Sequence, residues 1–424
     1  MMDRALAETL VAGLASDETD RDLLWAILPT LHECSSEVFH HPPWFELPRD
    51  FLLRTGFIGP RLIRVGDIAA LINTENQARS LMPIIREVAH HRDRKPRLVR
   101  PSAMGPGDFR RAWRRCASIE TEVLSRGRHL GVTLDQTALR RRLLKAIRGG
   151  FIFGHAHDRH DVRKLIVSNQ HLADHRSALR AAHRRGATSL YVPHAPAADT
   201  DAYRDLPVTV AALRGQLEED FYAQRGALPE RLRSVGNPAF PEVSPAPRLD
   251  GPVVVGLSPW PRERLQAMID LVADGVGRRT PVVVAPHPRS DRREISKLIP
   301  RAWAIHSGRT VELLRRGPSL LVQHSSGVAW EGLYLGVPTV QISLGCTAPT
   351  YALITAPYVP TVRSAAELRD IVMTPSDRVD RAELRDWARR WCVSVGDIAA
   401  KQAANALEDM PRGPTLALDA WSVH

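Results

Sequence analysis

The stretch that decides the fold is residues 281–342, which reads PVVVAPHPRSDRREISKLIP at its start and PSLLVQHSSGVAWEGLYLGVPTVQI at its end. It holds two short apolar runs, at residues 282–285 and 320–323, and each run stops at a small polar cluster. Such runs are typical of buried parallel strands. In α/β folds the ligand site lies just beyond the carboxyl ends of the strands. The stretch therefore predicts an α/β protein with a site for a phosphorylated ligand at these strand ends.

The first polar cluster is His287, which lies between Pro286 and Pro288. An imidazole at the end of a strand can bind a phosphate or protonate a leaving group. A lone histidine often has no chemical role, but the flanking prolines and the strand-end position favour a functional one. We therefore count His287 among the phosphate-binding candidates.

The second cluster is His324-Ser325-Ser326-Gly327, which passes directly into a helical pattern that carries Glu331. The backbone N–H groups and hydroxyls of such a turn can bind a phosphate, although serine is also an ordinary helix N-cap. Glu331 falls about one turn into the helix, where a carboxylate could accept the hydroxyls of a ribose. Its alternative role is to complement the helix dipole.

Strand and helix patterns alternate in two successive series. In the first we expect strands at residues 67–73, 97–100, 164–168, 189–193, 208–212 and 231–235. In the second we expect strands at residues 253–257, 282–285, 320–323 and 339–342. The segment 241–252 holds four prolines and no periodicity, which is typical of a linker.

The two series predict two Rossmann-like domains that face each other across a cleft. We expect residues 1–245 to form the acceptor-side domain with a helical N-terminal extension, and residues 250–400 the nucleotide-donor domain. Residues 401–424 would be the end of the last helix and a tail.

Two helices have predicted ends. Thr133 and Gln136 form a capping box for a helix at residues 134–148, and Gly149 supplies its stop. A last long helical region is expected at about residues 382–407, packing back on the first domain.

The composition is that of an ordinary globular protein, with 44% apolar and 25% charged residues. No apolar run is long enough to span a bilayer, and the start of the chain lacks the features of a signal peptide, so we expect a cytoplasmic protein. The four cysteines are scattered without a CxxC pair, which favours buried free thiols over disulfides or zinc. We expect no metal and no cofactor.

The formal net charge is +11, mostly from arginine. Such a charge attracts phosphates or anionic lipid, which leaves a peripheral contact with the inner face of the membrane open. The alternative is that the arginine clusters lie on solvated helix faces. No zinc-finger or RNP-type motif accompanies them, so we expect no nucleic-acid partner.

The first domain offers three candidates for a catalytic base, in the segment VPHAPAADTD. His194 ends a predicted strand and would face the cleft opposite His287. Asp199 and Asp201 follow it and are alternative bases, although each is individually more typical of a solvated loop.

The order of these motifs is a strand-end histidine, a GNP turn, a linker, an HP dipeptide and an SS…E segment. This order resembles GT-B-fold transferases that build bacterial surface polymers: polysialyltransferases, capsule Kdo transferases and CDP-glycerol glycerophosphotransferases. The resemblance implies that His287, Ser325 and Ser326 contact the phosphate of a cytidine-linked donor. SSGVAWEGLYLGVPTV also resembles a segment of UDP-N-acetylglucosamine 2-epimerases, with Glu331 at the carboxylate position.

Two departures concern the base. The strand that usually ends in His-Gly ends here in His194-Ala195, and no acidic-acidic-Gly motif is present. The identity of the base therefore stays open.

We accordingly expect a metal-independent GT-B transferase. It would move a sugar or glycerol-phosphate unit from a CMP-, CDP- or UDP-linked donor to a glycan or lipid-linked acceptor. The alternatives are an isomerase of the UDP-N-acetylglucosamine 2-epimerase kind and a nucleotide-sugar-binding subunit without catalysis.

Overall fold

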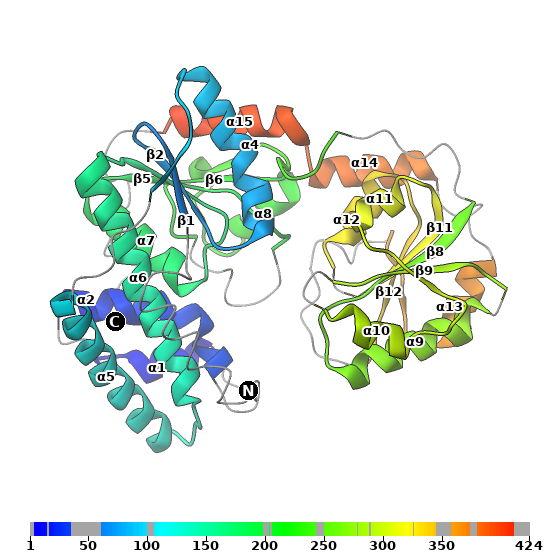
Figure 1. The fold of residues 1–424 in the computed structure, drawn as a ribbon, viewed down its shortest axis with the longest axis horizontal. Helices are drawn as coiled ribbons and strands as arrows, with labels where there is room; N and C mark the ends of the chain where they lie inside the picture. The colour runs from blue at the N-terminus through cyan, green and yellow to red at the C-terminus, as the bar shows by residue number, and fades with distance from the viewer. Residues whose placement is uncertain are drawn as a thin grey trace.

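The computed structural model describes residues 4–14, 17–34, 61–99, 106–197, 203, 206–242, 250–277, 279–287, 290–324, 326–344, 358–373 and 380–410. They form two lobes, each built on its own sheet (Figure 1). The sheets are separate and mostly parallel, with helices packed on them, so the predicted α/β fold of two Rossmann-like units is confirmed. Among these residues no helix combines the length and the apolar character needed to span a bilayer.

The sheet of the first lobe has the strand order β3-β1-β2-β4-β5-β6-β7. Its strands are β1 (Arg61–Val65), β2 (Ile68–Ile72), β3 (Arg97–Val99), β4 (Lys164–Val167), β5 (Thr188–Tyr191), β6 (Val210–Leu213) and β7 (Leu232–Ser234). β1 pairs antiparallel with β2 and β3, and β2, β4, β5, β6 and β7 are parallel to one another. All six strands expected here exist within two residues of their predicted starts, whereas β1 was not predicted.

The sheet of the second lobe is parallel throughout, in the order β10-β9-β8-β11-β12-β13. Its strands are β8 (Gly251–Gly256), β9 (Val282–Ala285), β10 (Ala304–Ile305), β11 (Pro318–Gln323), β12 (Thr339–Ile342) and β13 (Thr361–Val362). The valine-rich runs of β8 and β9 are buried on both faces because helices cover the sheet. The sequence therefore predicted the central strands of this sheet, while the two-residue strands β10 and β13 carry too little pattern to be seen.

The helices of the first lobe precede β8 in the chain, except for the last helix. They are α1 (Arg4–Val11), α2 (Glu18–Ile27), η1 (Leu28–Cys34), α4 (Glu75–His91), α5 (Pro106–His129), α6 (Gln136–His160), α7 (Ala173–Arg184), α8 (Gln216–Ala223) and η4 (Pro229–Arg231). α1, α2 and η1 share one apolar core with α5 and α6 beside the sheet (Figure 1). Cys34 and Cys116 lie in this core, and they and Cys392 are buried cysteines that form no disulfide among the described residues, as expected; Cys346 lies outside the described residues.

The remaining helices follow β8. They are α9 (Arg262–Val276), α10 (Arg292–Leu298), α11 (Thr310–Leu314), α12 (Val328–Tyr334), α13 (Ala365–Met373), α14 (Arg381–Trp391) and α15 (Gly396–Glu408). The last helical region expected at residues 382–407 is present, but taking it as undivided would be wrong, because the chain breaks between α14 and α15. α14 packs in the core of the second lobe, and α15 lies on the first lobe against α4 (Figure 1). The break lets the chain cross between the lobes.

The predicted end of α6 is also wrong. The helix begins after Asp135, whose side chain accepts hydrogen bonds from Thr137 N and Ala138 N, and continues through Gly149 to His160. A Cβ atom at residue 149 would lie well inside the contact distance of the carbonyl group of Asp174, at the start of α7. Gly149 therefore serves a close crossing of two helices and not a helix stop.

Candidate active site between the lobes

Four parallel strands of the first sheet end at polar residues. β2 leads into Asn73, β4 into Ser168, β5 by way of Val192 and Pro193 into His194, and β6 into Arg214. Carboxyl ends of parallel strands meet at one edge of a sheet, which is where α/β proteins bind ligands. This edge is the first-lobe half of the candidate site.

His194 is half-buried and held by the backbone of the neighbouring strand. Its Nδ1 atom lies 2.5 Å from the carbonyl oxygen of Ser168. A carbonyl oxygen only accepts, so Nδ1 carries the proton and Nε2 is left with the lone pair. Burial lowers the pKa of His194 to about 4; the bond to Ser168 opposes this shift, and the charge of Arg214 adds to it. His194 is therefore a neutral imidazole at neutral pH, with its basic nitrogen fixed in direction.

Arg214 fixes the loop that carries His194. Its guanidinium donates to the carbonyl oxygens of Ala195 at 2.9 Å and Pro193 at 3.3 Å. The same side chain forms a buried ion pair with Glu218, 2.6 Å between Nη1 and Oε1. Burial alone would lower the pKa of Arg214, but the Glu218 carboxylate outweighs it and the pKa is raised. The arginine thus stays charged and ties both neighbours of His194 to β6.

A second histidine lies behind His194. His175 is fully buried, and its Nδ1 atom donates to Asp174 Oδ1 at 2.9 Å. Asp174 also accepts from Asn73 Nδ2 at 2.5 Å. Burial opposes ionisation of Asp174, but the contacts with His175 and Asn73 outweigh it and lower its pKa. His175 lies near enough to His194 to help lower the pKa of that imidazole.

Three buried polar atoms at this edge have no hydrogen-bond partner among the described residues. They are Asn73 Oδ1, Ser168 Oγ and His175 Nε2. Buried polar atoms are nearly always paired with protein or water. Three such atoms around one strand edge indicate a place where a polar ligand or ordered water completes the hydrogen bonding.

The second-lobe half of the site lies at the end of β11. The Gln323 side chain is buried, and its Oε1 atom accepts from Ser326 N at 2.8 Å. Ser326 Oγ accepts from Val328 N at 3.4 Å. The N–H of Ser326 is therefore used within the turn, so only its hydroxyl is left to reach a phosphate, contrary to the expectation that this backbone group points at the ligand. Ser325 lies outside the described residues.

Glu331 is on α12, half-buried between the lobes. Burial raises the pKa of its carboxyl to about 7, and the nearby charges of Arg309, Arg79 and Arg214 limit the rise. Arg79 and Arg214 belong to the first lobe, so the carboxyl lies within range of charges on both sides. At neutral pH Glu331 can both donate and accept a hydrogen bond, which suits the two hydroxyls of a ribose.

The two halves meet where the His194 loop approaches the α12 turn. A Cβ atom at Gly327 would lie 3.2 Å from Pro196 Cδ, two residues beyond His194. This contact brings the loop that carries His194 beside the Ser326–Gly327 turn, while the position of His194 opposite His287 stays a prediction. His287 is half-buried at the end of β9, two strands away from β11 in the sheet. Asp199 and Asp201 lie outside the described residues.

Sequence reasoning missed the Asp174–His175 pair and the Arg214–Glu218 pair. A signal for the first was available: HLADH is separated from the end of β4 by three residues and leads into a helix. Arg214 follows β6 directly. A charged residue after a strand is common, and only burial distinguishes the Asp174–His175 and Arg214–Glu218 pairs from solvated ones.

No family model matches the chain, and no curated protein matches it. Among solved structures, UDP-GlcNAc 2-epimerase from Neisseria meningitidis bound to UDP-GlcNAc is 12% identical over 77% of this chain and 94% of that one, with a TM-score of 0.47. The S. aureus MnaA–UDP co-structure is 10% identical, covering 78% and 92%, with a TM-score of 0.46. CalG4, the calicheamicin glycosyltransferase, is 16% identical, covering 68% and 81%, with a TM-score of 0.41. Similarity at this level concerns the fold alone and not the function.

Proposed function

We propose that this chain is a transferase that moves a sugar or glycerol-phosphate unit from a nucleotide-activated donor to a hydroxyl group of a glycan or lipid-linked acceptor. The observation that carries the proposal is His194. Its proton lies on Nδ1 because Ser168 accepts it, and its loop meets the Ser326–Gly327 turn of the other lobe. A fixed neutral imidazole between two Rossmann-like lobes is suited to remove a proton from an acceptor.

In this reaction His194 Nε2 takes the proton of the acceptor hydroxyl. The oxygen then attacks the transferred unit, and the bond to the nucleotide phosphate breaks, so the nucleotide leaves with the electron pair. A pKa of about 4 describes His194 without ligand. The negative phosphates of a bound donor would favour the charged imidazolium and raise this pKa toward neutrality, where a general base works best.

The donor side needs groups that stabilise the charge developing on the leaving phosphate. We assign this role to His287 and to the hydroxyls of Ser325 and Ser326, and the ribose to Glu331. All four assignments rest on strand-end positions and on the raised pKa of Glu331, with a cytidine-linked donor as the preferred form. In this scheme histidine and serine side chains stabilise the charge in place of a metal ion, so activity should persist in EDTA.

The test is to incubate the protein with CMP-, CDP- and UDP-linked donors, with and without acceptor, and to measure nucleotide release. His194→Ala should lower turnover by roughly 10²–10⁴-fold and leave nucleotide affinity nearly unchanged. The matched control is His157→Ala, because the His157 ring also contacts a backbone carbonyl oxygen, that of Val162, at 2.9 Å, but at the far end of α6.

Each outcome separates the alternatives. Acceptor-dependent nucleotide release supports the transferase, while an altered sugar without release would indicate an epimerase. Binding without turnover would indicate a non-catalytic subunit. If His194→Ala loses nucleotide affinity instead of turnover, the histidine is a donor ligand and Asp199, Asp201 and Glu75 become the bases to test.

A further inference from the structure

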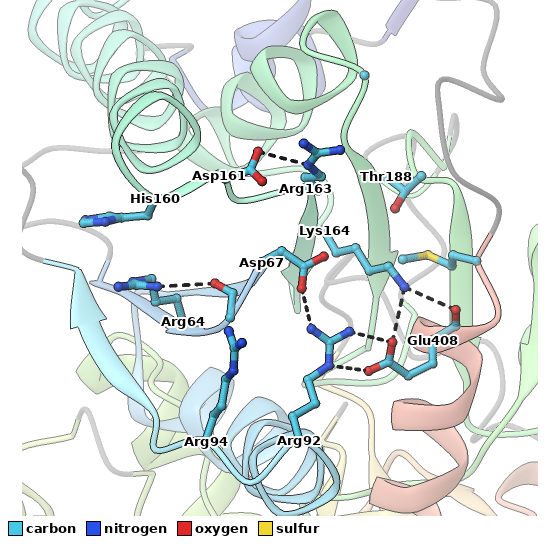
Figure 2. A pocket seen from close by; sticks show the side chains of 13 residues that line it. Arg64, Asp67, Arg92, Arg94, His160, Asp161, Arg163, Lys164, Thr188 and Glu408 are labelled. Atoms are coloured by element: carbon cyan, nitrogen blue, oxygen red, sulfur yellow. Dashed lines mark hydrogen bonds and ion pairs between the residues drawn. The ribbon is translucent and has the colours of Figure 1, made fainter.

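A pocket of about 870 Å³ lies on the first lobe, and Figure 2 shows its lining. Its lining includes Lys164, the first residue of β4, and Thr188, the first residue of β5. These strands end at the carboxyl edge described above, so the pocket lies at their amino ends. It shares no residue with the candidate active site.

The pocket is strongly basic, and its carboxylates are already paired. Glu408 binds the Arg92 guanidinium through two hydrogen bonds, at 2.8 and 2.7 Å, and Asp67 binds the same group. Glu408 also lies 3.5 Å from Lys164 Nζ. Asp161 pairs with Arg163 at 2.9 Å. These three are all the carboxylates of the lining.

Two further arginines of the lining, Arg64 and Arg94, have no acidic partner among the described residues. Figure 2 shows the side chains of Arg64 and Arg94 on the same side of the pocket. Arg64 Nη1 donates to the Gly66 carbonyl at 3.4 Å, and Arg94 Nη1 lies 3.2 Å from where a Cβ of residue 66 would be. Two uncompensated guanidinium groups thus converge on one residue that has no side chain.

The neighbouring Arg92 strengthens this convergence. Its Nη1 atom lies 3.3 Å from the same Cβ position, so three arginines surround Gly66 and carboxylates compensate only one of them. The positive field also reaches His160, whose pKa is lowered by burial and by the charge of Arg64. Like charges held this close repel each other, and an anion between them would remove that repulsion.

We propose that Arg64 and Arg94, beside Gly66 and Arg92, form a binding site for a phosphate group, separate from the nucleotide-donor site. Arginine presents two parallel N–H groups to phosphate oxygens, which makes a pair of guanidinium groups a preferred receptor for this ligand. The phosphate could belong to a soluble phosphorylated compound or to the headgroup of an anionic lipid, and both present the same oxygens.

The experiment compares wild type with Arg64→Gln/Arg94→Gln by calorimetric titration with pyrophosphate and by sedimentation with phosphatidylcholine vesicles, with and without phosphatidylglycerol. We expect the double variant to bind at least about tenfold more weakly, since charge-assisted hydrogen bonds are lost from two side chains. The matched control is Arg86→Gln/Arg128→Gln, which removes two charges at exposed positions outside the pocket. Arg94→Gln alone, at an exposed position, provides a variant in which folding is least at risk.

Pyrophosphate binding that falls in the double variant supports a soluble phosphorylated ligand. Vesicle binding that falls in it, with pyrophosphate unbound, supports a lipid headgroup. Three results would overturn the site: no binding of either probe by wild type, equal losses in the control, or a loss that occurs in His287→Ala and not in the pocket variants. The last result would put the phosphate in the donor site instead.

Discussion

At the scale of single residues, Glu331 has the most unusual chemistry in the candidate site. Its pKa of about 7 in the folded chain exceeds the value of 4.5 expected without burial. Between these pH values the folded chain keeps the proton and the unfolded chain releases it. Its contribution to stability is therefore complete below pH 4.5 and is lost as the pH rises through about 7.

Glu331→Gln should remove this dependence. The amide keeps the shape and hydrogen bonding of the protonated acid, so the variant should match wild type near pH 4.5 and be more stable by about 1–3 kcal/mol at pH 8. Urea unfolding at several pH values measures the difference, and the exposed Glu263→Gln is the control. A variant that follows the wild-type curve at every pH would show that Glu331 has an ordinary pKa.

The residues that we propose to bind the donor lead to a second prediction. His287→Ala and Ser326→Ala should each weaken nucleotide binding by about 1–3 kcal/mol, the usual contribution of a hydrogen bond to a charged group. Calorimetric titration with CDP measures this, with His306→Ala and Ser296→Ala as controls elsewhere on the same lobe. Unchanged affinity in both donor-site variants would contradict a phosphate role at these positions.

At the scale of elements, the crossing of α6 and α7 depends on Gly149. Gly149→Ala should destabilise the fold by about 3 kcal/mol, because the new methyl group meets backbone at Asp174 that cannot move aside. Gly150→Ala is the matched control: its Cβ would lie 2.9 Å from Ser177 Oγ, which can rotate away, so we expect a change within about 1 kcal/mol. Denaturant unfolding compares the two, and equal effects would mean that the helices can separate without cost.

The same glycine shows where sequence reasoning stopped. Local signals predicted the strands because an apolar run ending in polar residues is visible in the chain itself, and β9 and β12 have their predicted bounds. They failed at Gly149, because a glycine can either end a helix or let a second helix pack closely against it. The sequence alone does not show which of these two roles the glycine has. Local signals failed likewise to divide α14 from α15, since both helices continue one helical pattern.

In the candidate site, too, some features could be predicted from the sequence and others only from the fold. The strand-end position predicted His194, but its tautomer and its clamp by Arg214 depend on β4 and β6, which are brought beside it only by the fold. The buried pairs at Asp174 and Glu218 differ from solvated carboxylates in burial alone, which one sequence does not reveal.

At the scale of the whole molecule, the last helix, α15, stabilises the first lobe. Leu407 on α15 is fully buried in the core that contains α4 and one face of the first sheet. Leu407→Ala should cost about 2–5 kcal/mol and loosen that lobe first. Hydrogen exchange should therefore rise in β2 and α4 while β11 and β12 keep their protection.

Leu368→Ala provides the opposite control, since Leu368 is equally buried but lies in the core of the second lobe. It should raise exchange in β11 and β12 and leave α4 protected. If both variants raise hydrogen exchange equally in both lobes, the two lobes unfold together as one cooperative unit.

The return of α15 has a consequence for synthesis on the ribosome. The second lobe completes its core with α14, whereas the first lobe lacks one covering helix until residues 396–408 emerge. β7 ends at Ser234, so at ordinary elongation rates this gap lasts on the order of ten to thirty seconds. Throughout that interval the part of the first sheet that α15 will cover is open to chaperones, and the lobe made first is the one finished last.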